Sequence, residues 1–315
     1  MRSSLLIGAV SLASAALLVQ AGTGTAVHAA ESSPVGYASM NGGTTGGAGG
    51  TTVTVTSASA LNTYATSSST YTIKIGSTIN LSSMQKVSSN KTIIGVGTSG
   101  KITGYGLNVT NAHNVIIRNL TFSGSGDDAI NVQYSTNVWV DHNDLSSAYD
   151  GLLDMKHGSD YLTVSWNHFH NHNKVSLLGH SDDNSAEDLG HLRATYVHNW
   201  FDGTTQRHPR VRFANVVHVL NNYYSNITGY GVASTCNAGV YVERNYFENV
   251  PTPTSTQEGS SPQGNIKEYH NYLVNSGAIV TRNSGSVAAV PYSYTPEAND
   301  TVKATVMSGA GVGKI

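Results

Sequence analysis

Residues 138–145 read VWVDHNDL, a short β-branched run that leads into asparagine, one further residue and leucine. Six copies of this ending, asparagine with an aromatic residue or leucine two positions later, recur at a nearly regular spacing. The triplets are Asn143-Asp144-Leu145, Asn167-His168-Phe169, Asn199-Trp200-Phe201, Asn222-Tyr223-Tyr224, Asn245-Tyr246-Phe247 and Asn271-Tyr272-Leu273. Their asparagines are 24, 32, 23, 23 and 26 residues apart. A period in the twenties is typical of a solenoid, in which each repeat buries its apolar face only against its neighbours.

The repeat predicts an all-β fold, a right-handed parallel β-helix with coils about 4.8 Å apart. Asparagine tolerates the left-handed turn conformation, so one asparagine at the same turn of every coil is expected to form a hydrogen-bonded ladder. Residues 57–65 carry alanine and leucine, which predicts a short helix that caps the N-terminal end of the stack. An antiparallel sandwich is the alternative, but it gives no reason to repeat one triplet at a fixed position.

The first 30 residues have the features of a secretory signal peptide. Arg2 supplies a positive start, residues 5–19 are apolar, and Ala29 and Ala30 resemble a signal peptidase site. The apolar run is too short for a comfortable membrane span. We therefore expect residues 1–30 to be a signal peptide, residues 31–315 to be one β-helix domain, and the mature protein to be secreted without a membrane partner.

Composition narrows the range of partners. The formal net charge is −2 and only 11% of the 315 residues are charged, which argues against nucleic acid binding and against disorder. An anionic partner must therefore bind a local cationic cluster. Cys236 is the single cysteine, so no intrachain disulfide can form, and we interpret it as a small buried apolar residue and not a reactive thiol. A monomer is expected for a capped solenoid.

The triplets also align charged residues in successive coils. Counted from the last residue of each triplet, with Phe122 standing for the preceding coil, four charged residues fall five or six positions further on. They are Asp128, Asp150, Lys174 and Arg207. In a stack, these side chains lie next to one another on one outer strip, two acids beside two bases. The chain has few charged residues, so four of them gathered in one strip indicate a functional site.

Asp154 adds a third carboxylate four residues after Asp150. In an unbroken strand these two would be about 13 Å apart, so one ion could hold both only if the chain bends near Gly151. Three carboxylates without histidine or cysteine suit a hard cation such as Ca²⁺. Exposed aspartates at turns are the alternative interpretation of each acid taken singly.

Residues 207–212 carry three arginines, Arg207, Arg210 and Arg212. Guanidinium groups match carboxylates in geometry, so a polyanionic substrate is the natural partner of this segment. A solvated basic edge is the alternative.

His168, His170 and His172 alternate as zinc ligands sometimes do. Because His168 belongs to a turn triplet and no further ligand lies at the usual zinc spacing, a zinc site is not predicted here.

Residues 138–142, 150–154, Lys174 with 177–179, and 207–212 together resemble the pectate lyases of polysaccharide lyase family 1. The R-x-P-x-x-R and D-x-x-x-D motifs carry most of this resemblance, which spans roughly residues 36–250. It implies a right-handed parallel β-helix, and cleavage of polygalacturonate, the de-esterified form of pectin, by calcium-dependent β-elimination. It further implies that Asp128, Asp150 and Asp154 bind calcium, that Lys174 and Arg212 hold substrate carboxylates, and that Arg207 is the catalytic base.

Two other functions are alternatives to a pectate lyase. A polygalacturonase-like hydrolase on the same fold would need two carboxyl groups that act as acid and base, and it has no use for the Arg207 motif. A non-catalytic β-helix adhesin or glycan-binding module has no need for acids and bases in one strip. The 32-residue gap between Asn167 and Asn199 contains about eight extra residues, which we expect within residues 180–190, next to the substrate.

Overall fold

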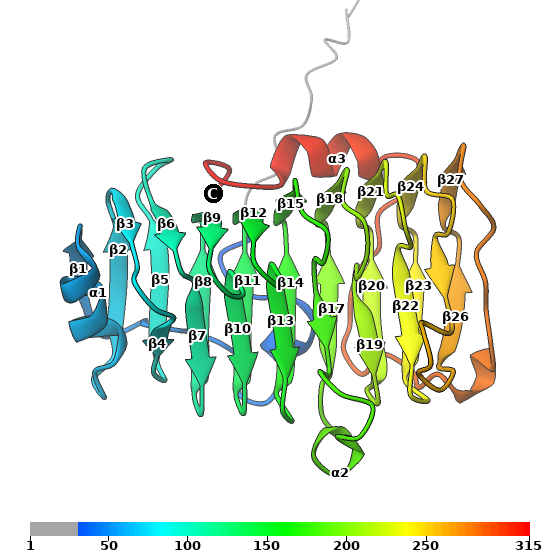
Figure 1. The fold of residues 1–315 in the computed structure, drawn as a ribbon, viewed down its shortest axis with the longest axis horizontal. Helices are drawn as coiled ribbons and strands as arrows, with labels where there is room; N and C mark the ends of the chain where they lie inside the picture. Colours follow the sequence, from blue (N-terminus) through cyan, green and yellow to red (C-terminus); the bar gives the residue numbers. More distant parts are fainter. Residues whose placement is uncertain (1–30) are drawn as a thin grey trace, which may run out of the picture.

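The computed structural model describes residues 31–315, so the expected signal peptide lies outside the described part of the chain. These residues form a parallel β-helix whose complete coils pass through three sheets in turn (Figure 1). The all-β solenoid predicted from the triplets is therefore confirmed. No helix within residues 31–315 has both the length and the apolar character that a membrane span requires.

Sheet 1 has ten strands and starts each coil. They are β1 (Thr51–Val55), β2 (Tyr71–Ile75), β5 (Lys91–Gly95), β8 (His113–Arg118), β11 (Thr136–Asp141), β14 (Asp160–Ser165), β17 (Ala194–Val197), β20 (Asn215–Leu220), β23 (Gly239–Glu243) and β26 (Asn265–Tyr269).

Sheet 2 has nine strands. They are β3 (Thr78–Asn80), β6 (Lys101–Gly104), β9 (Thr121–Ser125), β12 (Asp144–Ala148), β15 (His168–His170), β18 (Trp200–Asp202), β21 (Tyr223–Ser225), β24 (Tyr246–Glu248) and β27 (Tyr272–Val274).

Sheet 3 has eight strands. They are β4 (Gln85–Val87), β7 (Leu107–Thr110), β10 (Ile130–Gln133), β13 (Leu153–Lys156), β16 (Leu177–Leu178), β19 (Arg210–Arg212), β22 (Val232–Thr235) and β25 (Thr254–Ser255).

Three short α-helices flank the stack. They are α1 (Ala58–Ala65), α2 (Ser185–Asp188) and α3 (Val302–Gly309), and two 3₁₀ turns cover Gly36–Ser39 and Ser284–Ser286. The predicted capping helix is confirmed as α1, which lies at the N-terminal end of the β-helix in Figure 1. It buries Leu61 and Ala65 in the core. Ser57 caps it by accepting a hydrogen bond from the Ala60 amide. Helix α3 lies along sheet 2, where Val302 and Val306 pack against Tyr223.

The turn from sheet 1 to sheet 2, which we call the ladder turn, contains the asparagine of each triplet. The Asn143 amide donates to Asn167 Oδ1 at 2.9 Å, and the same contact links each asparagine to the next, up to the Asn245–Asn271 pair at 3.0 Å. Each amide also donates to a backbone carbonyl of the preceding coil, as Asn143 does to Ile117. The asparagines from Asn143 to Asn245 are fully buried and fully bonded, so the predicted ladder is present.

The asparagines of the ladder do not themselves adopt the left-handed conformation that was expected of them. The left-handed conformation belongs to the residue before each triplet asparagine, such as His142 (φ 51°), Trp166 (φ 54°) and Arg244 (φ 49°). Bulky residues adopt that conformation at a cost of roughly 1–2 kcal/mol, which the buried amide hydrogen bonds of the next residue offset. Asparagine is therefore required at the ladder because its side-chain amide can both donate and accept hydrogen bonds, and not because of its backbone freedom.

The extra residues in the long repeat lie in the expected part of the sequence, while their position next to the substrate stays a prediction. Strand β16 ends at Leu178 and β17 begins at Ala194, while the equivalent connection between β13 and β14 spans only residues 157–159. The insertion carries α2, which projects from the turn between sheet 3 and sheet 1 in Figure 1. This turn is at the opposite end of the sheet 3 strands from the turn that holds the predicted acids.

Candidate active site

The predicted site residues lie in the turn from sheet 2 to sheet 3, which we call the site turn. Asp128 stands between β9 and β10, Asp150 between β12 and β13, Lys174 between β15 and β16, and Arg207 between β18 and β19. The triplet alignment that brought them together is confirmed, because Leu145 pairs with both Phe122 and Phe169, and Phe169 pairs with Phe201.

The alignment continues into the turn and then shifts by one residue. Lys174, five positions after Phe169, pairs with Gln206, five positions after Phe201, so Arg207 lies one position past the residue beside Lys174. Further on, Leu177 pairs with Arg210, eight and nine positions after the same two phenylalanines. The site turns also differ in length, from residues 126–129 in one coil to 203–209 in another. The hydrogen bond from Lys174 is the main cause of the lowered pKa of the Asp150 carboxyl group. Arg207 lies near enough for its positive charge to lower this pKa further.

The chain bends between Asp150 and Asp154, as one shared ion would require. Strand β13 begins only at Leu153, and residues 149–152 are bent or irregular. A Cβ added to Gly151 would lie 2.2 Å from Asp154 Oδ1, so the Asp154 carboxylate rests directly on the glycine backbone. The Gly151 amide also donates to Asp128 Oδ1 at 2.8 Å. Glycine at position 151 thus allows the carboxylates of Asp128 and Asp154 both to lie against its backbone.

Asp128 and Asp154 form a buried acidic pair. Asp154 is 2% exposed and accepts from the Leu177 amide at 3.0 Å. Burial raises its pKa, and the neighbouring charge of Asp128 raises it further. Burial likewise raises the pKa of Asp128, against the opposing effect of Lys156. Two buried carboxylates that repel each other favour a bound cation.

Sequence reasoning missed two residues beside this pair. Lys156 donates to Asp128 Oδ2 at 3.2 Å from the end of β13. Asn131 pairs with Asp154 across β10 and β13, and its Oδ1 is buried without a hydrogen-bond partner among the described residues. Lys156 follows Asp154 by two positions, so strand alternation could have placed both on the outer face. Nothing in the sequence distinguishes Asn131 from the other asparagines.

The donor set fits calcium by its chemistry. Asp128, Asp154 and Asn131 offer oxygen atoms only, and the unpartnered Asn131 Oδ1 is an acceptor that a hard cation would satisfy. Asp150 is further out, with its side chain 45% exposed and bonded to Lys174 Nζ at 2.8 Å. Asp128, Asp150 and Asp154 are more widely spaced than a compact metal site requires. Within residues 31–315, the group whose ligand atoms all lie within 4.8 Å of one another consists of Asp144, His168 and His170.

The arginine segment divides into different roles. Arg207 is partly exposed in a left-handed conformation (φ 65°), and its Nε is buried with no hydrogen-bond partner in residues 31–315. Arg212 is only 8% exposed and is already engaged, since Nε donates to Asp182 at 2.6 Å and Nη1 donates to the Gly179 carbonyl at 2.9 Å. Arg210 Nε is likewise unbonded, but Arg210 Nη2 donates to Ser261 Oγ at 2.7 Å. Among the described residues, Arg207 is therefore the arginine of this segment whose guanidinium donates no hydrogen bond.

Asp182 comes from the insertion and is a partner that spacing did not reveal. It accepts from Arg212, from Ser261 Oγ at 2.7 Å and from Cys236 Sγ at 3.3 Å. Although partial burial opposes the change, these hydrogen bonds, led by that from Arg212, lower the pKa of Asp182. Cys236 is buried, as expected from its size and polarity. The insertion thus contacts Arg212, while the predicted acids lie at the other end of the sheet 3 strands.

Known proteins are similar to this chain in sequence and in fold. A sequence model of the family described as pectate lyase matches residues 7–315. A probable pectate lyase B of Aspergillus terreus is 45% identical over 234 residues, which cover 71% of each chain. The chain belongs to the pectate lyase family. A pectate trisaccharide-lyase of Bacillus licheniformis is 39% identical over 300 residues, covering 89% of this chain and 86% of the relative.

Solved structures agree with the family assignment. A pectate lyase from Bacillus sp. N165 in complex with trigalacturonate superposes with a TM-score of 0.80 at 35% identity, covering 89% of this chain and 99% of the other. The chain is therefore an enzyme of the pectate lyase class on a parallel β-helix, as the sequence motifs indicated. The family assignment also decides against the hydrolase and the non-catalytic module that were weighed as alternatives.

Proposed function

We propose that this protein cleaves the α-1,4 bonds of polygalacturonate by calcium-dependent β-elimination, with Arg207 as the base, and releases 4,5-unsaturated oligogalacturonates. The observation that carries the proposal is one row of site turns in which a buried acidic pair is followed by Lys174 and by Arg207 with its unbonded Nε. The substrate class is supported by the relative from Bacillus sp. N165, whose structure contains trigalacturonate.

The chemistry requires a base next to a neutralised carboxylate. Arg207 would accept the proton from C5 of a galacturonate unit. The released electron pair forms the C4–C5 double bond, the C4–O bond to the departing chain breaks, and the departing oxygen takes a proton from solvent. An arginine that accepts a proton must first lose one, so we expect the rate to rise into alkaline pH.

Charge stabilisation is the second requirement. The carboxylate of the reacting sugar gains negative charge as C5 loses its proton, and positive charge held beside it lowers the barrier. Lys174 is suited to this role, because its side chain is 37% exposed and its ammonium group donates to Asp150 Oδ1. Arg212 is proposed to contribute as a substrate-binding residue at the edge nearest the insertion, although its guanidinium must be shared with Asp182.

Calcium is proposed to be held by Asp128, Asp154 and Asp150, with Asn131 Oδ1 as a further oxygen ligand. A bound calcium ion would neutralise the substrate carboxylate and make the adjacent proton more acidic. The protein's own contribution is to orient the three acids, through the Gly151 and Leu177 amides and through Lys174.

One assay tests this proposal. The protein is incubated with polygalacturonate, and ultraviolet absorbance of the unsaturated product is followed together with reducing ends, first with calcium and then with excess chelator. We expect absorbance that chelator abolishes and added calcium restores, and an Asp154→Asn variant that needs more calcium. Reducing ends without absorbance would indicate hydrolysis, and binding without product would indicate a lectin-like role. Activity unaffected by chelator would rule out the calcium assignment.

We also propose that the enzyme is secreted after removal of residues 1–30, on the basis of the apolar segment that follows Arg2, and that it is a monomer, as expected for a capped solenoid. The mass of protein recovered from culture medium, measured intact and by light scattering, checks both statements. A mass that retains the first 30 residues, or a dimer, would contradict them.

A further inference from the structure

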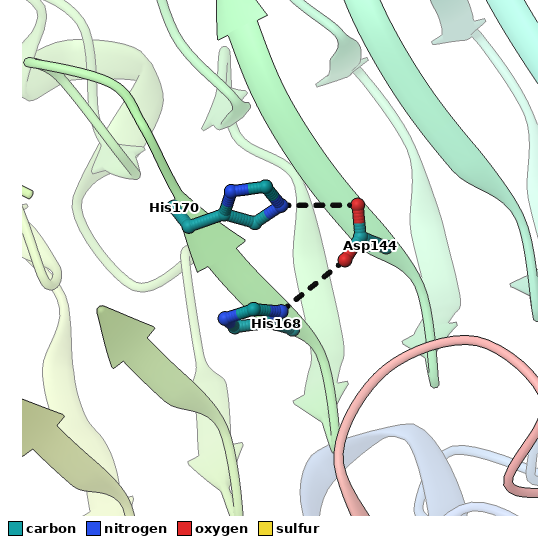
Figure 2. Close-up of side chains that lie close together, drawn as sticks. All are labelled: Asp144, His168 and His170. Atoms are coloured by element: carbon teal, nitrogen blue, oxygen red, sulfur yellow. Dashed lines mark hydrogen bonds and ion pairs between the residues drawn. The ribbon is translucent and has the colours of Figure 1, made fainter. Parts of the chain in front are cut away.

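A second cluster of possible metal ligands lies on the outer face of sheet 2, away from the proposed calcium residues. Asp144 begins β12 and pairs with His168, which begins β15. His170 is two residues further along β15 and therefore faces the same side. Figure 2 shows the two imidazole rings, one above the other, both directed at the single carboxylate. This explains why spacing along the chain did not predict the cluster, since its third member comes from the preceding coil.

The geometry is compact enough for a metal ion. His168 Nδ1 lies 3.2 Å from Asp144 Oδ2, and His170 Nε2 lies 3.1 Å from Asp144 Oδ1. Ligands bound tetrahedrally at about 2.0–2.1 Å from zinc are roughly 3.3–3.4 Å from one another, so these separations need little adjustment. The ligand atoms of all three residues lie within 4.8 Å of one another. Two imidazole nitrogens and one carboxylate oxygen form a donor set typical of zinc and related ions.

A supporting shell orients the ligands. The other ring nitrogen of His168, Nε2, lies 3.3 Å from Asp202 Oδ2 on the next coil. If Nε2 carries the proton and donates it to Asp202, Nδ1 is left free to bind metal, which is the carboxylate–histidine–metal arrangement of many metal sites. Asp202 is itself held by Ser225 Oγ at 3.0 Å, and Ser225 accepts from Trp200 Nε1 at 2.9 Å. This chain of contacts fixes the ring of His168 in one orientation.

We propose that Asp144, His168 and His170 form a binding site for a divalent transition-metal ion, for which zinc is the probe, with a fourth position left to water. The side chains are 20–32% exposed, so an ion can enter from solvent. The bound ion would join β12 to β15 and, through Asp202, to β18. These strands lead into the site turns of Asp150, Lys174 and Arg207, so the ion would fix the spacing of the coils that carry the proposed chemistry.

The site is distinct from the proposed calcium residues. Asp144 begins β12 and His170 ends β15, whereas Asp150 and Lys174 lie beyond the ends of those strands, in the site turn. The donor types differ as well, because nitrogen ligands favour zinc and all-oxygen sets favour calcium. Saturating calcium should therefore not displace zinc from this cluster.

The test measures zinc binding to the untagged full-length mature protein in excess calcium, by equilibrium dialysis with elemental analysis and by competition with a chromophoric chelator. We expect one equivalent of zinc in the wild type. His168→Gln should weaken binding by more than about 100-fold, and Asp202→Asn by about 10–100-fold through the supporting shell. His113→Gln, which alters an exposed histidine of β8, is the matched control and should bind as the wild type does.

Two further readouts keep the result independent of pectate cleavage. X-ray absorption at the zinc edge should show nitrogen and oxygen ligands at about 2.0–2.1 Å. Zinc should also raise the melting temperature of the wild type and of His113→Gln but not of His168→Gln. Three results would overturn the proposal: binding of less than one equivalent of zinc, equal zinc affinity in His168→Gln, or displacement of the bound zinc by calcium. Each would leave the cluster as an ion-paired network only.

Discussion

The ladder turn and the site turn are two corners of the same coils, and they are built in opposite ways. At the ladder turn, one residue type recurs in coil after coil, and each amide bonds to the same partners in its neighbours. At the site turn, successive coils contribute Asp128, Asp150, Lys174 and Arg207, and the turns vary in length. The first corner repeats, while the second changes with every coil.

The difference shows how a solenoid accommodates a site. A ladder of identical, fully bonded residues sets the register of all three sheets, so the opposite corner does not need to contribute to it. The site turn can then hold groups that weaken a fold, including the mutually repelling acids Asp128 and Asp154 and the unbonded Nε of Arg207. This comparison predicts that substitutions at the site turn affect activity and that substitutions at the ladder turn affect stability.

The largest effect is expected at Arg207. Arg207→Lys keeps a positive charge but moves the nitrogen that would accept the C5 proton, so kcat should fall by about 10³-fold, in the middle of the range for loss of a general base. The free energy of unfolding should change by less than about 0.5 kcal/mol, because the Arg207 Nε makes no hydrogen bond within the described residues. Steady-state kinetics on polygalacturonate and urea denaturation measure the two quantities.

Arg244 provides the matched control for this variant. It is also an arginine in the left-handed conformation (φ 49°), but it occupies a ladder turn and lies over the ring of Tyr269. Arg244→Lys should leave kcat within about twofold of the wild type, since no reacting group is near it. If Arg207→Lys retained more than a tenth of the wild-type rate, Arg207 would not be the base.

The next largest effect is expected within the ladder. Asn199 accepts from the backbone amide and the side-chain amide of Asn167, and it donates to the Val164 carbonyl and to Asn222 Oδ1. Asn199→Ala leaves these buried groups without partners, so the free energy of unfolding should fall by about 3 kcal/mol. The midpoint of urea denaturation measures the loss, and kcat of the folded variant should remain near that of the wild type.

An exposed pair of asparagines isolates the contribution of burial. Asn249 Nδ2 donates to Asn226 Oδ1 at 2.9 Å, the same distance as in the ladder, but both residues are exposed. Asn249 is left-handed (φ 56°), so Asn249→Gly avoids backbone strain. Its unfolding free energy should stay within about 0.5 kcal/mol of the wild type. An equal loss in Asn249→Gly and Asn199→Ala would mean that burial of the ladder does not matter.

The two corners also differ in how well the sequence predicts them. The ladder could be predicted because its residues repeat, and a repeat in sequence becomes a column in space. The insertion could be predicted because it interrupts that repeat. Asp144 and His168 hold the same position in successive triplets, so the repeat also aligns these two residues. The pairing of Lys156 with Asp128 and of Asp182 with Arg212 could not be predicted, because each joins residues of different coils. Such contacts depend on register through turns of unequal length, which residue counting does not provide.

The smallest of these effects concerns pH and comes from a histidine beside Arg207. His208 is fully buried, with Nδ1 donating to the Tyr230 carbonyl at 2.8 Å and Nε2 accepting from Thr204 Oγ1 at 2.8 Å. This network satisfies the neutral ring, and burial lowers the pKa of His208 to about 4. In the unfolded chain the pKa returns to about 6.5. The unfolded state therefore binds more protons between these two values.

The sign of the pH effect follows from that difference. Stability linked to His208 is complete above about pH 6.5 and falls as the pH decreases toward 4, by about 2 kcal/mol between pH 7 and pH 5. His208→Gln removes the titrating group, so the decrease in unfolding free energy over this range should be about 2 kcal/mol smaller than in the wild type. Urea denaturation of both proteins at the two pH values measures it. Parallel losses in the two proteins would show that His208 is not the source, and that acid acts on the site turn through its other charges.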